Sequence, residues 1–161
     1  MYFCHTGAEF LLSHFDFRDK QIIIGGGLAG LISAIHLSKL GLQVTVIEKN
    51  SYPKHKVCGE YISNEVLPYL SWLDLKISEL QPTAINKLQF STQNGKVINS
   101  ELPLGGFGVS RYTLDLFLYE KALSNGCIIL QDTAENVVFN DNRFSITTSN
   151  KAVLESEIVI G

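Results

Sequence analysis

The feature that most constrains this chain is a glycine-rich turn between a short apolar run and a helical pattern. Residues 22–24 are three consecutive isoleucines, which is typical of a buried parallel strand. The sequence Gly25-x-Gly27-x-x-Gly30 follows at once, and apolar residues then recur at helical spacing to about residue 40. A second strand is expected over 43–48. The pattern therefore predicts a β-α-β unit.

Each of the three glycines has its own physical role in such a turn. Gly25 permits a tight change from strand to helix, and Gly30 lets the helix pack closely on the strand. Gly27 lets the backbone approach a pyrophosphate without a Cβ in the way. The helix N-terminus then offers N–H groups and a positive dipole end to the phosphates. The pattern is a dinucleotide-binding fingerprint, and an ordinary tight turn is the alternative.

Glu48 supports the nucleotide interpretation. It ends the second expected strand, 18 positions after Gly30, close to the spacing of about 20 residues in dinucleotide-binding folds. A carboxylate there accepts hydrogen bonds from a ribose diol and repels a 2′-phosphate, which disfavours NADP. A solvated strand end is the alternative for Glu48. The turn and the carboxylate together favour nucleotide binding.

Composition narrows the class of protein. The chain has 161 residues, a net charge of −3, 45% hydrophobic and 18% charged residues, which predicts one folded domain and excludes intrinsic disorder. The charge gives no electrostatic case for nucleic-acid binding. No apolar run approaches the roughly 18 residues of a membrane span. Three scattered cysteines (Cys4, Cys58 and Cys127) fit neither a disulfide framework nor a metal site, and predict reduced thiols in a cytoplasmic setting.

Outside the β-α-β unit, the first half of the chain has weaker signals. Residues 1–20 lack clean periodicity and are expected to form a poorly ordered extension, with a short surface helix as the alternative. Residues 49–62 are expected to be irregular. A helix is expected over 63–77, with a break or kink at Pro68.

Turn signals divide the second half of the chain. Strands expected over 85–91 and 96–100 form a hairpin through Asn94-Gly95. A flexible loop is expected at Gly105, Gly106 and Gly108. The remaining expected elements are a helix over 112–123, a strand over 127–131 and an antiparallel meander over 137–140, 143–148 and 153–160.

The fingerprint alone does not separate NAD from FAD, because both cofactors contain adenosine diphosphate. In an NAD-dependent dehydrogenase, a further helix and a third parallel strand are expected soon after Glu48. Residues 49–63 are irregular instead. This continuation favours FAD and leaves an NAD-dependent dehydrogenase as a weaker alternative.

Four segments support FAD through a resemblance. They are Gly-Gly-Gly-Leu-Ala-Gly at 25–30, Ile-Glu-Lys at 47–49, Val-Cys-Gly-Glu at 57–60 and Arg-x-x-Leu-Asp-x-x-Leu at 111–118. With them, residues 21–161 resemble the geranylgeranyl reductase family of FAD-dependent oxidoreductases, in the p-hydroxybenzoate hydroxylase-like group. The resemblance implies an α/β fold: a Rossmann-like FAD/NAD(P)-binding domain with a parallel sheet and an antiparallel β-meander, incomplete at the C-terminus.

The resemblance also implies a set of residues around FAD. Cys58 and Gly59 would lie on a loop near the flavin. Cys58 is expected to be a packing or redox-sensitive residue, and a catalytic thiol is the alternative. Arg111 would contact a phosphate or ribose, and an ion pair with Asp115 is its alternative. Ala134, with the adjoining Thr133, would lie near the adenine. The implied cofactor-binding residues are Gly25, Gly27, Ala29, Gly30, Glu48, Lys49, Cys58, Gly59, Arg111 and Ala134.

Members of this family also have a second cofactor segment and a Gly-Asp motif, which the 161 residues do not include. We therefore expect the N-terminal FAD-binding portion of an oxidoreductase that reduces an isoprenoid-like alkene or hydroxylates an aromatic or lipid substrate, with NAD(P)H as a candidate electron donor. The alternative is an inactive nucleotide-binding fragment. The 83–101 hairpin is expected on the interdomain or substrate side. We expect a small-molecule or lipid-like substrate, and association with another molecule through an uncovered apolar face. The expected location is cytoplasmic, with peripheral association with a membrane as a further possibility. No metal or catalytic residue is assigned.

Overall fold

The structure is a computed structural model that describes residues 20–57 and 60–161. The predicted N-terminal extension, apart from Lys20, and the predicted loop residues Cys58 and Gly59 lie outside the described residues. The chain divides into two compact units. Of the described residues, the first holds those up to Asn50 and those from Ala122 onward, and the second holds those within Ser51–Lys121.

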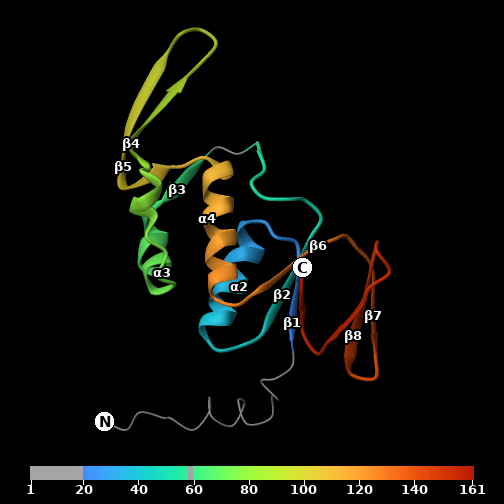
Figure 1. Cartoon of the computed structure of the whole chain (residues 1–161). Helices are drawn as coiled ribbons and strands as arrows, with labels where there is room; N and C mark the ends of the chain where they lie inside the picture. The colour runs from blue at the N-terminus through green and yellow to red at the C-terminus, as the bar shows by residue number, and fades with distance from the viewer. Residues whose placement is uncertain (1–19, 58–59) are drawn as a thin grey trace, which may run out of the picture. The chain divides into compact units, whose positions relative to one another are not determined.

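The first unit is built on a four-stranded parallel sheet in the order β10-β1-β2-β6. Helix α2 (Leu28–Lys39) joins β1 to β2 and packs on them, which confirms the predicted β-α-β unit (Figure 1). Ile22 and Ile47, at most 2% exposed, form a buried hydrophobic cluster of the first unit together with Ile146. The strands are β1 (Gln21–Ile24), β2 (Val44–Glu48), β6 (Ile128–Gln131) and β10 (Val159–Ile160).

The first unit also contains the predicted antiparallel meander, with one correction. Its strands are β7 (Ala134–Asn140), β8 (Arg143–Thr148) and β9 (Val153–Ser156). The single strand expected over 153–160 is wrong, because β9 ends at Ser156 and β10 joins the parallel sheet beside β1. The Ser156 hydroxyl donates to the carbonyl of Lys20 at 2.6 Å and accepts from the N–H of Ile158 at 3.1 Å. These bonds hold the chain where it changes sheet.

The second unit contains a three-stranded antiparallel sheet in the order β3-β5-β4. Strands β4 and β5 form a long hairpin (Figure 1), and Gly95 at its turn has a φ of +76°, as the Asn94-Gly95 signal predicts. Helix α4 (Arg111–Ser124) begins in this unit and ends in the first. The other elements are β3 (Tyr61–Ser63), β4 (Thr83–Ser91), β5 (Val97–Gly108), α3 (Leu67–Trp72) and the 3₁₀ turns η1 (Asn64–Val66) and η2 (Ile77–Leu80).

The flexible loop predicted at Gly105, Gly106 and Gly108 is wrong, because all three residues belong to β5. Gly106 pairs with both neighbouring strands. A Cβ on Gly106 would lie 2.4 Å from the Tyr61 ring and 2.6 Å from the Ile62 carbonyl oxygen. Glycine there allows close approach of a ring and a backbone, and does not mark a loop.

The helix predicted over 63–77 is also corrected. Residues 61–63 form β3, where the sequence predicts an irregular segment to 62 and a helix from 63, and α3 covers only Leu67–Trp72. Pro68 lies in the first turn of α3, where its missing N–H costs no hydrogen bond. It therefore starts a short helix instead of kinking a long one.

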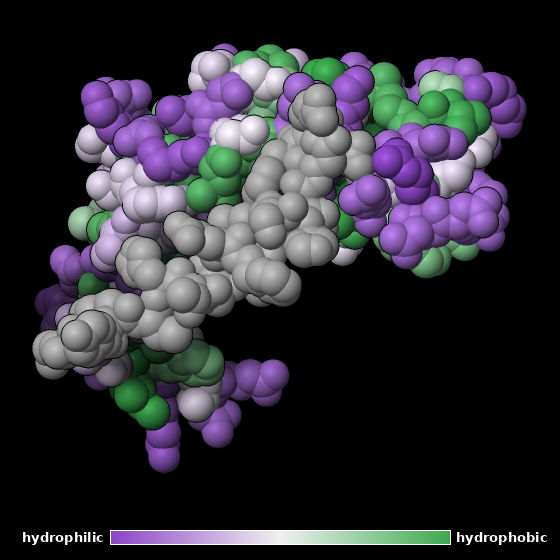
Figure 2. Space-filling model, turned by 90° about the horizontal axis from the view of Figure 1, so that it is seen from below, coloured by the Kyte–Doolittle hydropathy of each residue, from purple (hydrophilic) through white to green (hydrophobic). Residues whose placement is uncertain are grey.

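Surface and thiol features complete the description. None of the helices in the described part of the chain combines the length and apolar character needed to cross a membrane. Apolar side chains such as Phe90 and Val153 are 67% and 62% exposed, and on the face that Figure 2 shows, hydrophobic residues reach the surface among hydrophilic ones. Among the described residues, Cys127 is a buried free cysteine.

Candidate nucleotide-binding site

The glycine-rich turn in the first unit has the geometry that the fingerprint predicts. Gly25 has a φ of +104°, a conformation that favours glycine. Its N–H donates to the Ile47 carbonyl at 2.8 Å, which fastens the turn to β2. A Cβ on Gly30 would lie 1.9 Å from the Gly25 carbonyl oxygen. The turn and the close helix packing thus require glycine at these two positions.

The start of α2 is open to an anion. Gly27 is its N-cap, no side chain caps the first turn, and no acidic residue lies in that turn. A Cβ on Gly27 would meet no atom within 4 Å, so the backbone there borders open space. Ala29 is exposed in the same turn. A cavity of about 190 Å³ adjoins the turn, and its lining includes Gly25, Gly27, Ala29, Gly30 and Ser33.

Glu48 lies at the end of β2 with its carboxylate held in place. It is only 8% exposed, so it is not a solvated strand end. One carboxylate oxygen accepts from the Gly26 N–H at 2.8 Å. The other accepts from the backbone N–H and side-chain Nδ2 of Asn50, at 2.8 Å and 2.6 Å. The neighbouring Lys49 is exposed. The Glu48 carboxylate is therefore a fixed hydrogen-bond acceptor beside the turn that offers N–H groups.

In the second unit, the predicted site residue Arg111 forms an ion pair. Its Nε and Nη2 donate to the two carboxylate oxygens of Asp115 at 2.7 Å and 3.0 Å. The Lys56 Nζ lies 3.3 Å from the same carboxylate. Asp115 is 1% exposed, so the carboxylate that pairs with Arg111 is buried. The sequence gives no signal for Lys56.

Ala134, the residue predicted near the adenine, begins β7 and packs against the core of the first unit. Just before it, the buried Asp132 carboxylate accepts hydrogen bonds from the Ser149 hydroxyl and the Thr133 N–H. These bonds, that of Ser149 foremost, hold the pKa of Asp132 well below its usual range. Asp132 thus joins the turn after β6 to the turn after β8. The sequence contains no motif that predicts this link.

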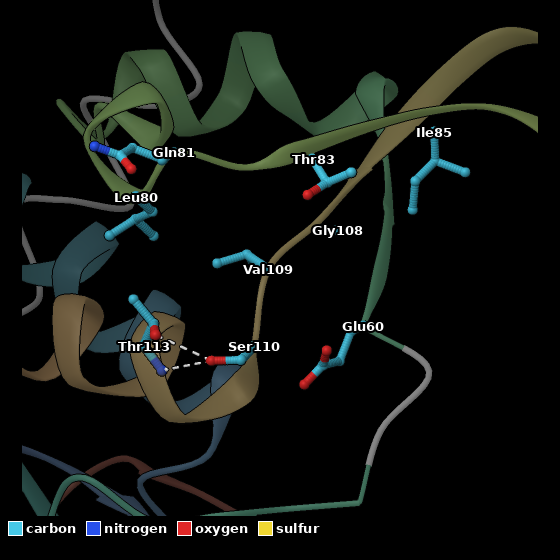
Figure 3. A pocket seen from close by; sticks show the side chains of 9 residues that line it. All are labelled: Glu60, Leu80, Gln81, Thr83, Ile85, Gly108, Val109, Ser110 and Thr113. Carbon is cyan, nitrogen blue, oxygen red and sulfur yellow. Dashed lines mark hydrogen bonds between the residues drawn. The ribbon is translucent and has the colours of Figure 1, made fainter.

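A second cavity, of about 460 Å³, lies in the second unit (Figure 3). The Ser110 hydroxyl accepts from the Thr113 N–H at 3.2 Å and caps α4, and the two hydroxyl oxygens are 3.0 Å apart. Figure 3 shows these two residues beside Val109, with Glu60 on the wall formed by the start of β3. The cavity is lined by Glu60, Leu80, Gln81, Thr83, Ile85, Gly108, Val109, Ser110 and Thr113.

Comparison with known proteins identifies the cofactor. Residues 20–60 match the model of a family described as FAD dependent oxidoreductase. They contain the whole turn and Glu48. This is an FAD-binding Rossmann-type fold. FAD is the cofactor of the matching family, and the open turn with its fixed carboxylate fits the adenosine diphosphate half of FAD.

Curated relatives extend the similarity along the chain. Protein FixC of Salmonella typhi is 30% identical over 150 residues, which cover 86% of this chain and 35% of FixC. The FAD-dependent monooxygenase janM of Penicillium janthinellum is 26% identical over 152 residues, covering 88% of this chain and 32% of that protein. The chain therefore spans about a third of the length of these relatives.

Solved flavoenzyme structures share the fold. The flavin-dependent halogenase CmlS is 27% identical, with a TM-score of 0.76 over 88% of this chain and 28% of its own. The p-nitrophenol 4-monooxygenase PnpA from Pseudomonas putida DLL-E4 has the same TM-score over 88% of this chain and 40% of its own, at 16% identity, which indicates the fold alone. The chain therefore has the fold of flavin-dependent oxidoreductases of the monooxygenase and halogenase type.

Proposed function

We propose that this chain is the FAD-binding portion of a flavin-dependent oxidoreductase, and that its first unit holds the adenosine diphosphate half of FAD. One observation carries the proposal: the buried Glu48 carboxylate is fixed on the same turn that leaves the start of α2 uncapped and open at Gly27. An acceptor for a ribose diol, at the end of β2, is thus hydrogen-bonded to the turn that carries the donors for a diphosphate.

Each part of the turn has a defined task in binding. The N–H groups in the first turn of α2 donate to the diphosphate, and the positive end of the helix dipole favours its charge. Gly27 and the small Ala29 let the cofactor approach the backbone. The Glu48 carboxylate accepts hydrogen bonds from the ribose. When FAD is bound, its flavin supplies the hydride or oxygen chemistry.

For the reaction, we favour reduction of an isoprenoid-like alkene by a geranylgeranyl reductase-like enzyme, with NAD(P)H as the electron donor. The segments at 57–60 and 111–118 support this choice. Hydroxylation of an aromatic or lipid substrate is the second candidate, and the similarity to a FAD-dependent monooxygenase favours it. We place the substrate on the side of the 83–101 hairpin, in the unit that holds the 460 Å³ cavity.

A nucleotide-binding portion without activity of its own is the other candidate. The observation that favours it is the extent of the match, since the chain spans about a third of its relatives. Binding and turnover therefore need separate measurements.

The test is a visible absorption spectrum of the purified chain, followed by titration with FAD and, separately, with NADH. Binding of FAD with a perturbed flavin spectrum is the expected result. Oxidation of added NADH by the flavin-loaded chain would support an autonomous enzyme, and binding without turnover would support the non-catalytic portion. Binding of NADH with no binding of FAD would overturn the proposal in favour of an NAD-dependent dehydrogenase.

A further inference from the structure

The carboxylate of Glu48 is held from two directions. The Gly26 N–H donates to one carboxylate oxygen from the glycine-rich turn, at 2.8 Å. The other oxygen accepts two hydrogen bonds from Asn50, whose backbone N and side-chain Nδ2 lie 2.8 Å and 2.6 Å away. All three residues belong to the first unit. Asn50 is thus part of the structure that fixes the ribose acceptor of the proposed function.

These hydrogen bonds compensate for the burial of a charge. Glu48 is 8% exposed, and an ionised carboxylate removed from water is tolerated when it is hydrogen-bonded. A glutamate side chain has three rotatable bonds, so a carboxylate without such bonds can take several orientations. Bonds to both oxygens restrict it. Less side-chain entropy is then lost when a ribose binds.

An asparagine suits this task chemically. Because an ionised carboxylate only accepts hydrogen bonds, the amide of Asn50 presents its NH₂ group to Glu48. The amide is neutral, so it orients the carboxylate and leaves the negative charge in place. A carboxylate at position 50 would repel Glu48, and a cation there would pair with it and compete with the ribose hydroxyls. The side chain of Asn50 is half-buried and reaches back only two residues.

We propose that Asn50 is a positioning residue, which orients the Glu48 carboxylate for the ribose hydroxyls and so allows the site to distinguish a ribose from a deoxyribose. This inference rests on the proposed function, and it adds to that function a residue that the glycine-rich fingerprint does not contain.

A matched pair of nucleotides separates positioning from a general structural role. ADP carries both ribose hydroxyls, whereas 2′,3′-dideoxy-ADP lacks them and keeps the base and the diphosphate. A residue that only stabilises the turn should affect the binding of both nucleotides alike. A residue that orients Glu48 should affect ADP alone, because the dideoxy compound has no hydroxyl to donate to the carboxylate. The ratio of the two dissociation constants is therefore the informative quantity.

The experiment measures this ratio for the full chain by displacement of bound FAD, followed by flavin fluorescence. We expect the wild type to prefer ADP at least about ten-fold, the size of a charged hydrogen bond. Asn50→Ala should reduce the preference to about three-fold or less, and should bind the dideoxy compound within about two-fold of the wild type. Asn140→Ala is the matched control, because Asn140 is an exposed asparagine at the end of β7 in the same unit. It should keep the wild-type preference.

A double-mutant cycle tests whether Asn50 acts through Glu48. In the Glu48→Ala background, Asn50→Ala should change ADP affinity less than about two-fold. An equal loss of ADP affinity in both backgrounds would indicate a general structural role and overturn the inference. An unchanged preference for ADP in Asn50→Ala would also overturn it, with the proposed function intact.

The wild type separates failure of this inference from failure of the proposed function. Binding of FAD without a preference for ADP over the dideoxy compound would remove Glu48 from the ribose site, and the role of Asn50 with it. Failure to bind FAD would instead overturn the proposed function as a whole. If Glu48→Ala does not fold, the preference measured in Asn50→Ala decides.

Discussion

The carboxylate of Glu48 accepts a hydrogen bond of 2.8 Å from the backbone N–H of Gly26, which ties the end of β2 to the turn that starts α2. The two residues are 22 positions apart and both are buried. The bond fixes the ribose acceptor of our proposal relative to the N–H groups offered to the diphosphate. Such preorganisation lowers the ordering cost of binding.

Glu48→Ala should weaken both the fold and FAD binding. The buried Gly26 N–H loses its carboxylate acceptor, which costs about 1–3 kcal/mol in the free energy of unfolding. Loss of the ribose acceptor should raise the FAD dissociation constant by roughly ten-fold or more. Denaturant unfolding and flavin fluorescence measure the two effects. Glu155→Ala, at an exposed position of β9, is the control. An unchanged FAD affinity in Glu48→Ala would remove Glu48 from the ribose site.

Alanine at two glycines of the turn should give opposite results. In Gly30→Ala the new Cβ would lie 1.9 Å from the Gly25 carbonyl oxygen, so we expect a loss of at least about 3 kcal/mol in the free energy of unfolding. In Gly27→Ala the Cβ meets no atom within 4 Å. That variant should unfold like the wild type and bind FAD at least about ten-fold more weakly, because the methyl group occupies the diphosphate's approach. Normal FAD affinity in Gly27→Ala would contradict the proposed position of the diphosphate.

Asp132 should make the fold sensitive to acid. The hydrogen bond from Ser149 keeps the pKa of its carboxyl well below the ordinary value of 3.8 in the folded chain. Because the folded-state pKa is the lower one, ionised Asp132 stabilises the fold above pH 3.8, and this contribution is lost as the pH falls below it. Ser149→Ala should therefore be less stable than the wild type at pH 7, with a difference that shrinks below pH 3.8. Chemical denaturation across pH measures this. A difference that does not change with pH would contradict the account.

Cys127 should be unreactive in the folded chain. Burial raises the pKa of its thiol, and the Sγ donates to the Ala34 carbonyl at 3.5 Å, so little of the reactive thiolate forms at neutral pH. In a Cys4→Ser, Cys58→Ser variant, a chromogenic disulfide reagent should react slowly with the native chain and completely after denaturation. Rapid reaction of the native chain would contradict the packing of α2 against the start of β6.

The sequence predicts correctly those elements whose conformation depends on a few neighbouring residues. The glycine-rich turn and the Asn94-Gly95 hairpin depend on backbone conformations that glycine favours, and both are present. The loop predicted at Gly106 is wrong because this glycine allows close contact with Tyr61, a residue distant in sequence. At Ser156 the chain leaves the antiparallel sheet for the parallel one. The hydrogen bond from Ser156 to the Lys20 carbonyl that accompanies this change joins residues far apart in the sequence, so no short pattern predicts it.

In the candidate site, too, the sequence predicts what depends on neighbouring residues and misses contacts between residues far apart in the chain. Glu48 is predicted because its spacing from the glycines is a property of the β-α-β unit, whereas the Arg111–Asp115 pair enters the sequence analysis only as the alternative to a cofactor contact. Lys56 could not be predicted, since it reaches Asp115 only when the 52–56 segment lies along α4. Asp132 likewise depends on a turn brought to it by the meander.

The measurement that tests the central claim most directly is competition between FAD and ADP for the purified chain. The account predicts saturable FAD binding, detected by flavin fluorescence, that ADP reverses competitively and that riboflavin does not, because the turn and Glu48 bind the adenosine diphosphate half. Absence of FAD binding, or FAD binding that riboflavin displaces and ADP leaves intact, would contradict it.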